Sequence, residues 1–103
     1  MAGRIRVRAS LKGDTCEVKA LMRHPMETGM RKDAQGNKIP AHFIKEVVAK
    51  VGDRVVMHAN WGAAVSQNPF LGFEFHGAKA GDEVVISYVD NKGETGEGSA
   101  KVK

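Results

Sequence analysis

Apolar and polar side chains alternate along most of this chain with a period of two residues. Residues 4–11 alternate arginine or serine with apolar residues, and residues 15–23 repeat the alternation after a Lys-Gly-Asp turn. This period is that of a β-strand, whose successive side chains point to opposite faces. The two segments therefore predict a hairpin with one buried face. That face consists of Ile5, Val7, Ala9 and Leu11 in the first segment and Cys16, Val18, Ala20 and Met22 in the second.

The segment 43–51 is compatible with either a helix or a strand. Its apolar residues Ile44, Val47, Val48 and Val51 have helical spacing, so an amphipathic helix is a serious alternative. Three of the four are valines, and β-branched residues favour strands. The following Gly-Asp pair and Arg-Val-Val-Met-His-Ala run also have the pattern of a turn and a returning strand. We therefore expect a strand here.

The rest of the sequence predicts three more strands, at residues 70–76, 83–89 and 95–102. Seven short strands with turn signals about every 8–12 residues are typical of a sandwich of two sheets. We therefore predict an all-β, immunoglobulin-like antiparallel β-sandwich without the disulfide, in a single domain over residues 1–103. Its interior is expected to contain Ile5, Val7, Val18, Ala20, Leu71, Phe73, Phe75, Val84, Ile86 and Tyr88.

A few large apolar residues do not fit the buried face. Leu21, Val85 and Val89 fall on the outer side of their strands in this register. An exposed apolar set indicates a second protein surface. A third layer of structure, or an error of one residue in the register, would also account for it. Trp61 is expected either to fill the core or to serve as an interface residue.

A long polar connection, residues 24–44, interrupts the strands. Connections in compact domains are usually much shorter, and long ones tend to be functional or disordered. Pro25 and Pro40 restrain the residues before them, and Gly29 and Gly36 favour turns. A flexible linker would be richer in serine and glycine. The connection is therefore predicted to be a shaped surface feature of the kind that binds partners.

The sequence offers little catalytic or metal-binding chemistry. A single cysteine, Cys16, excludes an internal disulfide, and its place on the core face predicts an inert, buried thiol. A thiol at the end of the sheet that meets a partner remains the alternative. His24, His42, His58 and His76 lack metal-ligand spacing, so each is expected to be a polar surface residue. We therefore predict no catalytic residue, no metal and no cofactor.

Charge narrows the choice of partners. The formal net charge is +4, but the basic residues are spread along the chain. The cluster of Arg4, Arg6 and Arg8 lacks the aromatic residues of a nucleic-acid surface, so a solvated face favouring anionic partners is expected instead. No apolar run is long enough to span a bilayer, and the N-terminus lacks the apolar segment of a secretory signal peptide. The sequence therefore predicts neither nucleic-acid nor membrane binding.

Three ordered motifs carry a family resemblance. They lie at residues 24–44 (His-Pro-Met-Glu-Thr-Gly, Arg-Lys-Asp and Ile-Pro-Ala-His-Phe-Ile), 61–70 (Trp-Gly and Ser-Gln-Asn-Pro-Phe) and 90–93 (Asp-Asn-Lys-Gly). Together they resemble the SoxZ subunit of the SoxYZ sulfur-carrier complex of thiosulfate oxidation. The resemblance implies a non-catalytic subunit that forms a heterodimer with a SoxY-like carrier and contacts other thiosulfate-oxidising enzymes transiently. It also implies a periplasmic protein without its own signal peptide, exported together with its partner.

This resemblance, together with the outward apolar residues, predicts where the partner binds. The expected partner-binding residues are Leu21, Met26, Glu27, Thr28, Met30, Trp61, Val85 and Val89. Beside them, Arg23, Arg31 and Lys32 are expected to attract the anionic sulfur species that the carrier presents. The alternative function is a stand-alone metal- or redox-binding sandwich that uses Cys16, the histidines and the methionines.

Overall fold

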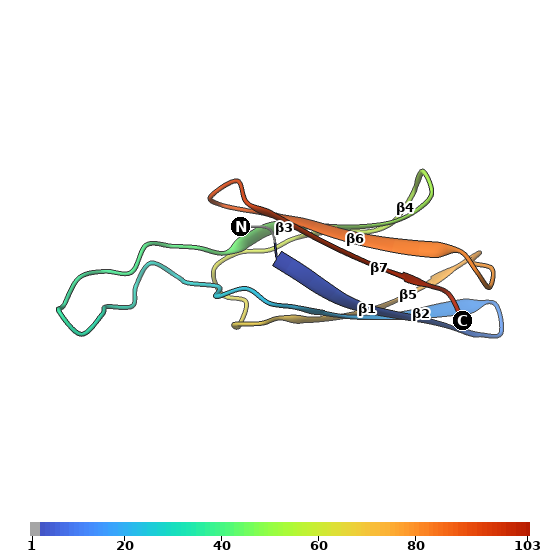
Figure 1. The fold of residues 1–103 in the computed structure, drawn as a ribbon, viewed down its shortest axis with the longest axis horizontal. Helices are drawn as coiled ribbons and strands as arrows, with labels where there is room; N and C mark the ends of the chain where they lie inside the picture. The colour runs from blue at the N-terminus through green and yellow to red at the C-terminus, as the bar shows by residue number, and fades with distance from the viewer. Residues whose placement is uncertain (1–2) are drawn as a thin grey trace.

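Two facing β-sheets make up the body of the protein (Figure 1). The computed structural model describes residues 3–103. The hydrogen-bonded strand order is β4-β3-β6-β7-β1-β2-β5. It divides at the short junction of β7 with β1 into a four-stranded sheet, β4-β3-β6-β7, and a three-stranded sheet, β1-β2-β5. The seven strands are β1 (Gly3–Lys12), β2 (Thr15–Met22), β3 (Ile44–Val51), β4 (Arg54–Asn60), β5 (Phe70–His76), β6 (Glu83–Asp90) and β7 (Thr95–Lys101).

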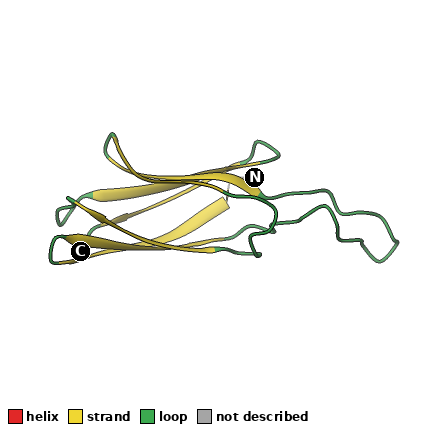
Figure 2. Ribbon diagram, turned by 180° about the vertical axis from the view of Figure 1, so that it is seen from behind, coloured by secondary structure: helices red, strands yellow, loops and turns green. Residues whose placement is uncertain are grey.

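The expected all-β sandwich is confirmed, and no helix occurs among residues 3–103 (Figure 2). Within each sheet the neighbouring strands are antiparallel. The segment whose spacing also suited a helix is the strand β3, paired on one side with β4 and on the other with β6. A strand between two neighbours favours β-branched side chains on both of its faces. The pattern of a single segment cannot show that a strand has two neighbours. The described residues contain no helix with the length and hydrophobicity needed to cross a membrane.

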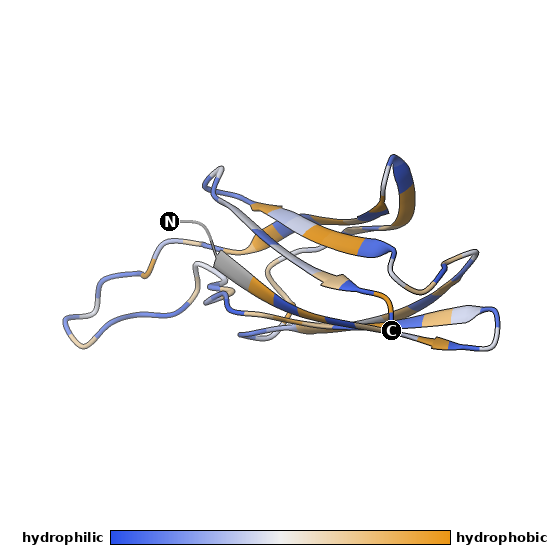
Figure 3. Cartoon of the chain, turned by 45° about the vertical axis from the view of Figure 1, so that its right-hand side comes forward, coloured by the Kyte–Doolittle hydropathy of each residue, from blue (hydrophilic) through white to orange (hydrophobic). Residues whose placement is uncertain are grey.

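The predicted interior is confirmed. Apolar and polar residues alternate along the strands (Figure 3). Most of the predicted residues are buried, and Val7, Leu71 and Phe73 are half-buried against them. The core also receives Met22, Ile44, Val47 and Ala49. The sequence pattern therefore identified the inward faces of both sheets correctly.

The two sheets meet where β1 and β7 run side by side. These strands pair in parallel at Gly3–Gly96 and Arg4–Glu97. Gly96 in β7 makes room for the ring of Tyr88 on β6, which would lie 2.2 Å from a Cβ atom there. Gly98 permits the close approach of β7 to β1, because its Cβ atom would lie 2.1 Å from the carbonyl oxygen of Ile5. Any larger residue would push the strands apart.

Residues 24–43 form a projecting two-stranded arm at one end of the sandwich (Figures 1 and 2). Glu27 and His42 exchange both backbone hydrogen bonds, at 2.7 and 2.9 Å, and the N–H of Ile39 donates to the carbonyl of Arg31. At the tip, the Asp33 carboxylate accepts hydrogen bonds from two backbone N–H groups. The molecule is elongated as a result, with principal extents of 54 × 21 × 19 Å. The prediction of a shaped feature is confirmed.

Candidate functional site

A cluster of two histidines and an aspartate lies at the base of the arm. His24 follows β2, His42 precedes β3, and Asp90 ends β6. The Nε2 atoms of His24 and His42 lie 3.0 and 2.7 Å from the same oxygen of Asp90, Oδ2. Asp90 is 2% exposed and His24 5%. Three segments that are distant in sequence are therefore joined through one buried carboxylate.

Hydrogen bonds determine which ring nitrogen of His24 carries the hydrogen. The backbone N–H of Met26 donates to Nδ1 of His24, so Nδ1 carries no hydrogen. The hydrogen of neutral His24 is consequently on Nε2, which donates to Asp90. Asp90 Oδ1 accepts two further bonds, from the backbone N–H groups of Lys92 and Glu94. The carboxylate is thus saturated with donors.

The electrostatics of Asp90 follow from these contacts. Burial raises the pKa of the Asp90 carboxyl, because the charged form loses its hydration. The hydrogen bonds from His24, His42 and the two backbone N–H groups favour the charged form and outweigh burial, so the pKa falls to about 2. Asp90 is therefore ionised over the physiological range. Glu94 adds a second carboxylate, 3.1 Å from Nε2 of His42.

Two of the motif segments hold the histidines in place through asparagines. The backbones of His24 and Asn68 are joined by a hydrogen bond, and the Asn68 side chain accepts from the N–H of His24. The Asn91 side chain accepts from the N–H of Phe43 and donates to the carbonyl of Ala41. The segments 24–44, 66–70 and 90–93, which carried the sequence resemblance, thus converge at the base of the arm.

The ligand atoms of His24, His42 and Asp90 all lie within 4.8 Å of one another, a spacing that a metal ion also requires. A histidine ligand usually donates its second ring N–H to an acceptor. In His24 the second nitrogen instead receives an N–H from Met26, so Nε2 must keep its hydrogen. The donor set therefore fits a hydrogen-bonded structural cluster and does not fit a cation.

The prediction of a surface position is wrong for His24, and His42 is half-buried. His58 and His76 are exposed, as expected. Periodicity gave no signal for the cluster, because His24 and His42 lie 66 and 48 positions from Asp90. The one available signal was that the two histidines bracket the long connection.

Cys16 is fully buried on β2, which confirms the expectation of an enclosed thiol. Burial raises the pKa of the Cys16 thiol, and the nearby charge of Asp82 raises it further. From Cys16 to Met22 the strand covers roughly 20 Å, at about 3.3 Å per residue. The thiol is therefore far from the histidine–aspartate cluster, and the alternative site built from cysteine and histidines is not assembled.

The predicted partner-binding residues do not form one patch. Leu21 lies on the outer face of the three-stranded sheet and is 42% exposed, whereas Val85 and Val89 lie on the outer face of the four-stranded sheet. Met26 is 5% exposed and packs in the core, so it offers no surface. Thr28 and Met30 are exposed on the arm, and Glu27 and Trp61 are half-buried.

Of the three predicted anion-attracting residues, one is paired with a carboxylate and two are not. Arg31 forms a two-pronged ion pair with Glu27 on the arm. This pairing lowers the pKa of Glu27 and raises that of Arg31. The charge of Arg31 is therefore balanced locally. Arg23 and Lys32 are exposed and form no ion pair within residues 3–103.

The outer face of the four-stranded sheet carries what we call the valine surface, formed by Val48, Val55, Val85 and Val89. Val55 is 53% exposed and the other three are partly buried. Their smallest cross-strand neighbours are serines: Ser87 lies opposite Val48, and Ser99 opposite Val85. The same face also carries charged residues: Lys50 lies opposite Val55 and Val85, and Glu46 lies opposite Val89. The valine surface is therefore a mixed one, with outward-facing valines among charged side chains, and such apolar residues can pack against another protein.

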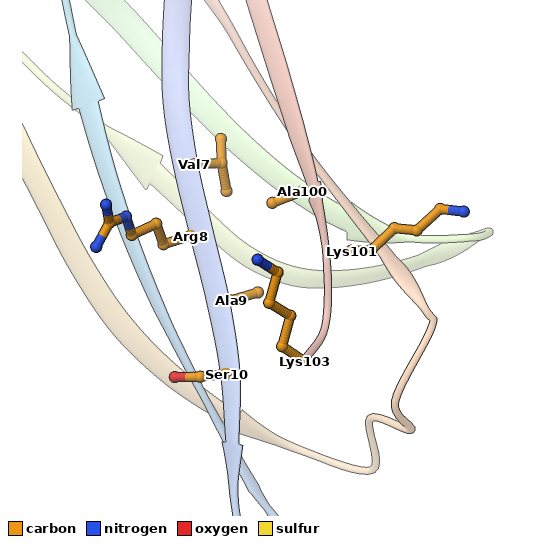
Figure 4. A pocket seen from close by; sticks show the side chains of 7 residues that line it. All are labelled: Val7, Arg8, Ala9, Ser10, Ala100, Lys101 and Lys103. Carbon is orange, nitrogen blue, oxygen red and sulfur yellow. The ribbon is translucent and has the colours of Figure 1, made fainter.

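A hollow of about 660 Å³ lies between β1 and β7, beyond their paired ends (Figure 4). Val7, Ala9 and Ala100 point into it, and Arg8 and Ser10 point to the opposite side of β1. Its titratable lining residues are Arg8, Lys101 and Lys103, all of them basic. The side chains that enter the hollow are therefore mainly apolar, and the hydroxyl group of Ser10 points away from Lys103.

The fold and the cluster define an immunoglobulin-like β-sandwich with an arm fastened to its end. The family model for the sulphur oxidation protein SoxZ matches residues 5–101. The chain belongs to the SoxZ family, and it is therefore a protein of sulfur oxidation. No curated protein sequence matches it significantly.

Solved structures with a similar fold include superoxide reductases and a hypothetical protein. A superoxide reductase in the oxidised state aligns with a TM-score of 0.66 and 13% identity, covering 100% of this chain and 90% of that one. The hypothetical protein PH1083 from Pyrococcus horikoshii aligns with a TM-score of 0.66 and 14% identity, covering 96% of this chain and 87% of that one. The superoxide reductase (neelaredoxin) from Archaeoglobus fulgidus in the reduced form aligns with a TM-score of 0.59 and 19% identity, covering 96% of this chain and 86% of that one. At these identities the likeness concerns the fold alone.

Proposed function

We propose that this chain is the non-catalytic subunit of a heterodimeric sulfur carrier. Its partner is a SoxY-like subunit, whose cysteine holds the covalent sulfur intermediates while other enzymes act on them. The observation that carries this proposal is the SoxZ family match over residues 5–101. The burial of the single cysteine and the outward-facing valines of the four-stranded sheet support it.

A carrier thiol must react as a thiolate and must reach several enzymes in turn. Cys16 has the opposite properties, since it is fully buried and its pKa is raised. The sulfur therefore resides on the partner. We expect no thiosulfate consumption by the purified chain alone; consumption that Cys16→Ser abolishes would contradict this division of roles.

The valine surface is the proposed pairing face. Stable complexes bury about 1,200–2,000 Å² in total, or about half of that on each partner. Four strands of seven or eight residues present a face of roughly 19 by 25 Å. This supplies much of one partner's share, and the exposed residues Thr28 and Met30 on the arm extend it.

Co-expression with a SoxY-like subunit tests this face. Val48→Asp with Val85→Asp places two charges on the valine surface and should abolish the heterodimer in size-exclusion chromatography with mass analysis. Both sites face outward, so the thermal unfolding midpoint of the chain should change little. An aspartate at Met26, by contrast, would enter the core and unfold the protein. Ser10→Asp, on the outer face of the other sheet, is the matched control. Unchanged pairing of the double variant would contradict the assignment.

The proposed location is the periplasm, reached by export together with the carrier. The SoxZ resemblance supports this location. Cell fractionation should find the chain in the periplasm when the carrier has its signal peptide, and in the cytoplasm when that peptide is deleted. Export without the carrier would contradict the proposal.

A further inference from the structure

The outer face of the three-stranded sheet carries a second distinctive surface, at the end nearest the arm. We call it the basic-apolar patch, and it consists of Arg6, Arg8, Lys19, Leu21 and Phe70. Leu21 lies opposite Arg6 on one side and Phe70 on the other. In the next row of the same face, Arg8 lies directly opposite Lys19. Together with Ala20, these side chains line a shallow hollow of about 200 Å³.

The positive charge of this patch is only partly neutralised by the fold. Like charges directly opposite each other in a sheet are destabilising, and Arg8 and Lys19 form such a pair. Lys19 lies 3.6 Å from Glu17, which also pairs with Lys12. Arg6 and Arg8 form no ion pair with any carboxylate of residues 3–103.

The apolar part of the patch is equally unusual for a surface. Phe70 is 63% exposed and Leu21 is 42% exposed, and the two are cross-strand neighbours. A Cβ atom on Gly72 would lie 3.5 Å from the Phe70 ring, so the ring leans over a position without a side chain. Aromatic and arginine side chains gathered in this way are typical of residues that dominate binding energy.

We propose that the basic-apolar patch docks an acidic, extended segment of a partner protein. Carboxylates of that segment pair with Arg6, Arg8 and Lys19, and an apolar side chain packs against Leu21 and Phe70. The patch lies on the opposite side of the sandwich from the valine surface, so it is available while the carrier is bound there.

Charge complementarity selects this occupant. A second copy of the chain related by a two-fold axis at the patch would place arginines and lysines against their own copies. A nucleic acid would satisfy the charges and would leave the aliphatic Leu21 without a suitable contact. An acidic segment with one apolar residue satisfies both halves of the patch.

The test uses the full chain and a fluorescein-labelled peptide, Glu-Glu-Leu-Glu-Phe-Glu-Glu, in fluorescence anisotropy at low salt. Arg8→Glu with Lys19→Glu should weaken binding by at least about tenfold, because attraction becomes repulsion. Phe70→Ser should weaken it by about threefold or more, and raising the salt concentration should weaken it for the wild type. Lys50→Glu, which reverses a charge on the other sheet, is the matched control and should bind normally.

A second readout separates binding from structure. Arg8→Glu alone creates an opposite-charge pair with Lys19, so the thermal unfolding midpoint should rise while peptide binding falls. Equal binding by the wild type and the double reversal would overturn the proposal. Tighter binding of oligo(dT) than of the peptide would overturn it in favour of a nucleic acid, and a dimer dissociated by the reversal would overturn it in favour of a second copy.

Discussion

At the scale of single residues, the side chain of Asp90 connects more parts of the fold than any residue that the sequence pattern identified. Its buried carboxylate accepts hydrogen bonds from both histidines and from two backbone N–H groups. These bonds join the base of the arm to the turn between β6 and β7. The charge of Asp90 therefore contributes to the stability of this end of the sandwich.

The depressed pKa of Asp90 makes a prediction about acid stability. The pKa is about 2 in the folded protein and near 3.9 in an unfolded chain, so the folded state binds fewer protons. The resulting stabilisation is present above the unfolded value and is lost as pH falls from about 4 to 2. It amounts to about 2 kcal/mol. Urea unfolding of Asp90→Asn should lack this loss, whereas the exposed control Asp53→Asn should retain it; an identical pH dependence in the wild type and both variants would refute the role.

Glycine in β7 is the second residue-scale requirement. Gly98→Ala would place a Cβ 2.1 Å from the backbone of β1, and we expect it to lower the free energy of unfolding by about 2–3 kcal/mol. A Cβ atom on Gly62 would meet no heavy atom within 4 Å, so Gly62→Ala should change that free energy by less than about 0.5 kcal/mol. Equal effects in chemical unfolding would show that the seam between β1 and β7 is not tight.

At the scale of elements, the strands were predictable and their assembly was less so. The period of two is a local property, and it identified the hairpin β1–β2 and the inward faces of β5 and β6. It cannot say which sheet a strand joins. Leu21 and Val85 were both recognised as outward-facing, yet they lie on opposite sides of the sandwich. The histidine–aspartate cluster escaped prediction for the same reason, since only the tertiary fold brings its three segments together.

The arm is an element that can be changed separately. Backbone hydrogen bonds between its two sides and the Asp33 side chain hold its tip, and the arm joins the sandwich at its base. Replacing residues 28–41 with Asn-Gly, which favours a tight hairpin turn, removes Thr28 and Met30 and should leave the thermal unfolding midpoint nearly unchanged. Because exposed residues of the arm extend the proposed pairing face, the affinity for the carrier should fall. A large loss of stability in calorimetry would show that the arm supports the core.

At the scale of the whole molecule, the two proposed binding faces lie on opposite sides of one sandwich. The valine surface combines outward-facing valines with charged residues of both signs, such as Lys50 and Glu46, and we propose it for the stable partner. The basic-apolar patch is charged and salt-sensitive, which suits a transient one. A subunit with this arrangement would have a scaffolding role, since we propose that it holds the carrier on one side and leaves the other side free.

The central claim is that this chain supports sulfur transfer without carrying sulfur. The most direct measurement is intact-mass spectrometry of both subunits after thiosulfate turnover by the reconstituted system. We predict sulfur adducts on the carrier cysteine alone, an unmodified mass for this chain, and the same turnover with Cys16→Ser. A sulfur adduct on Cys16, or full turnover when this chain is omitted, would contradict the account.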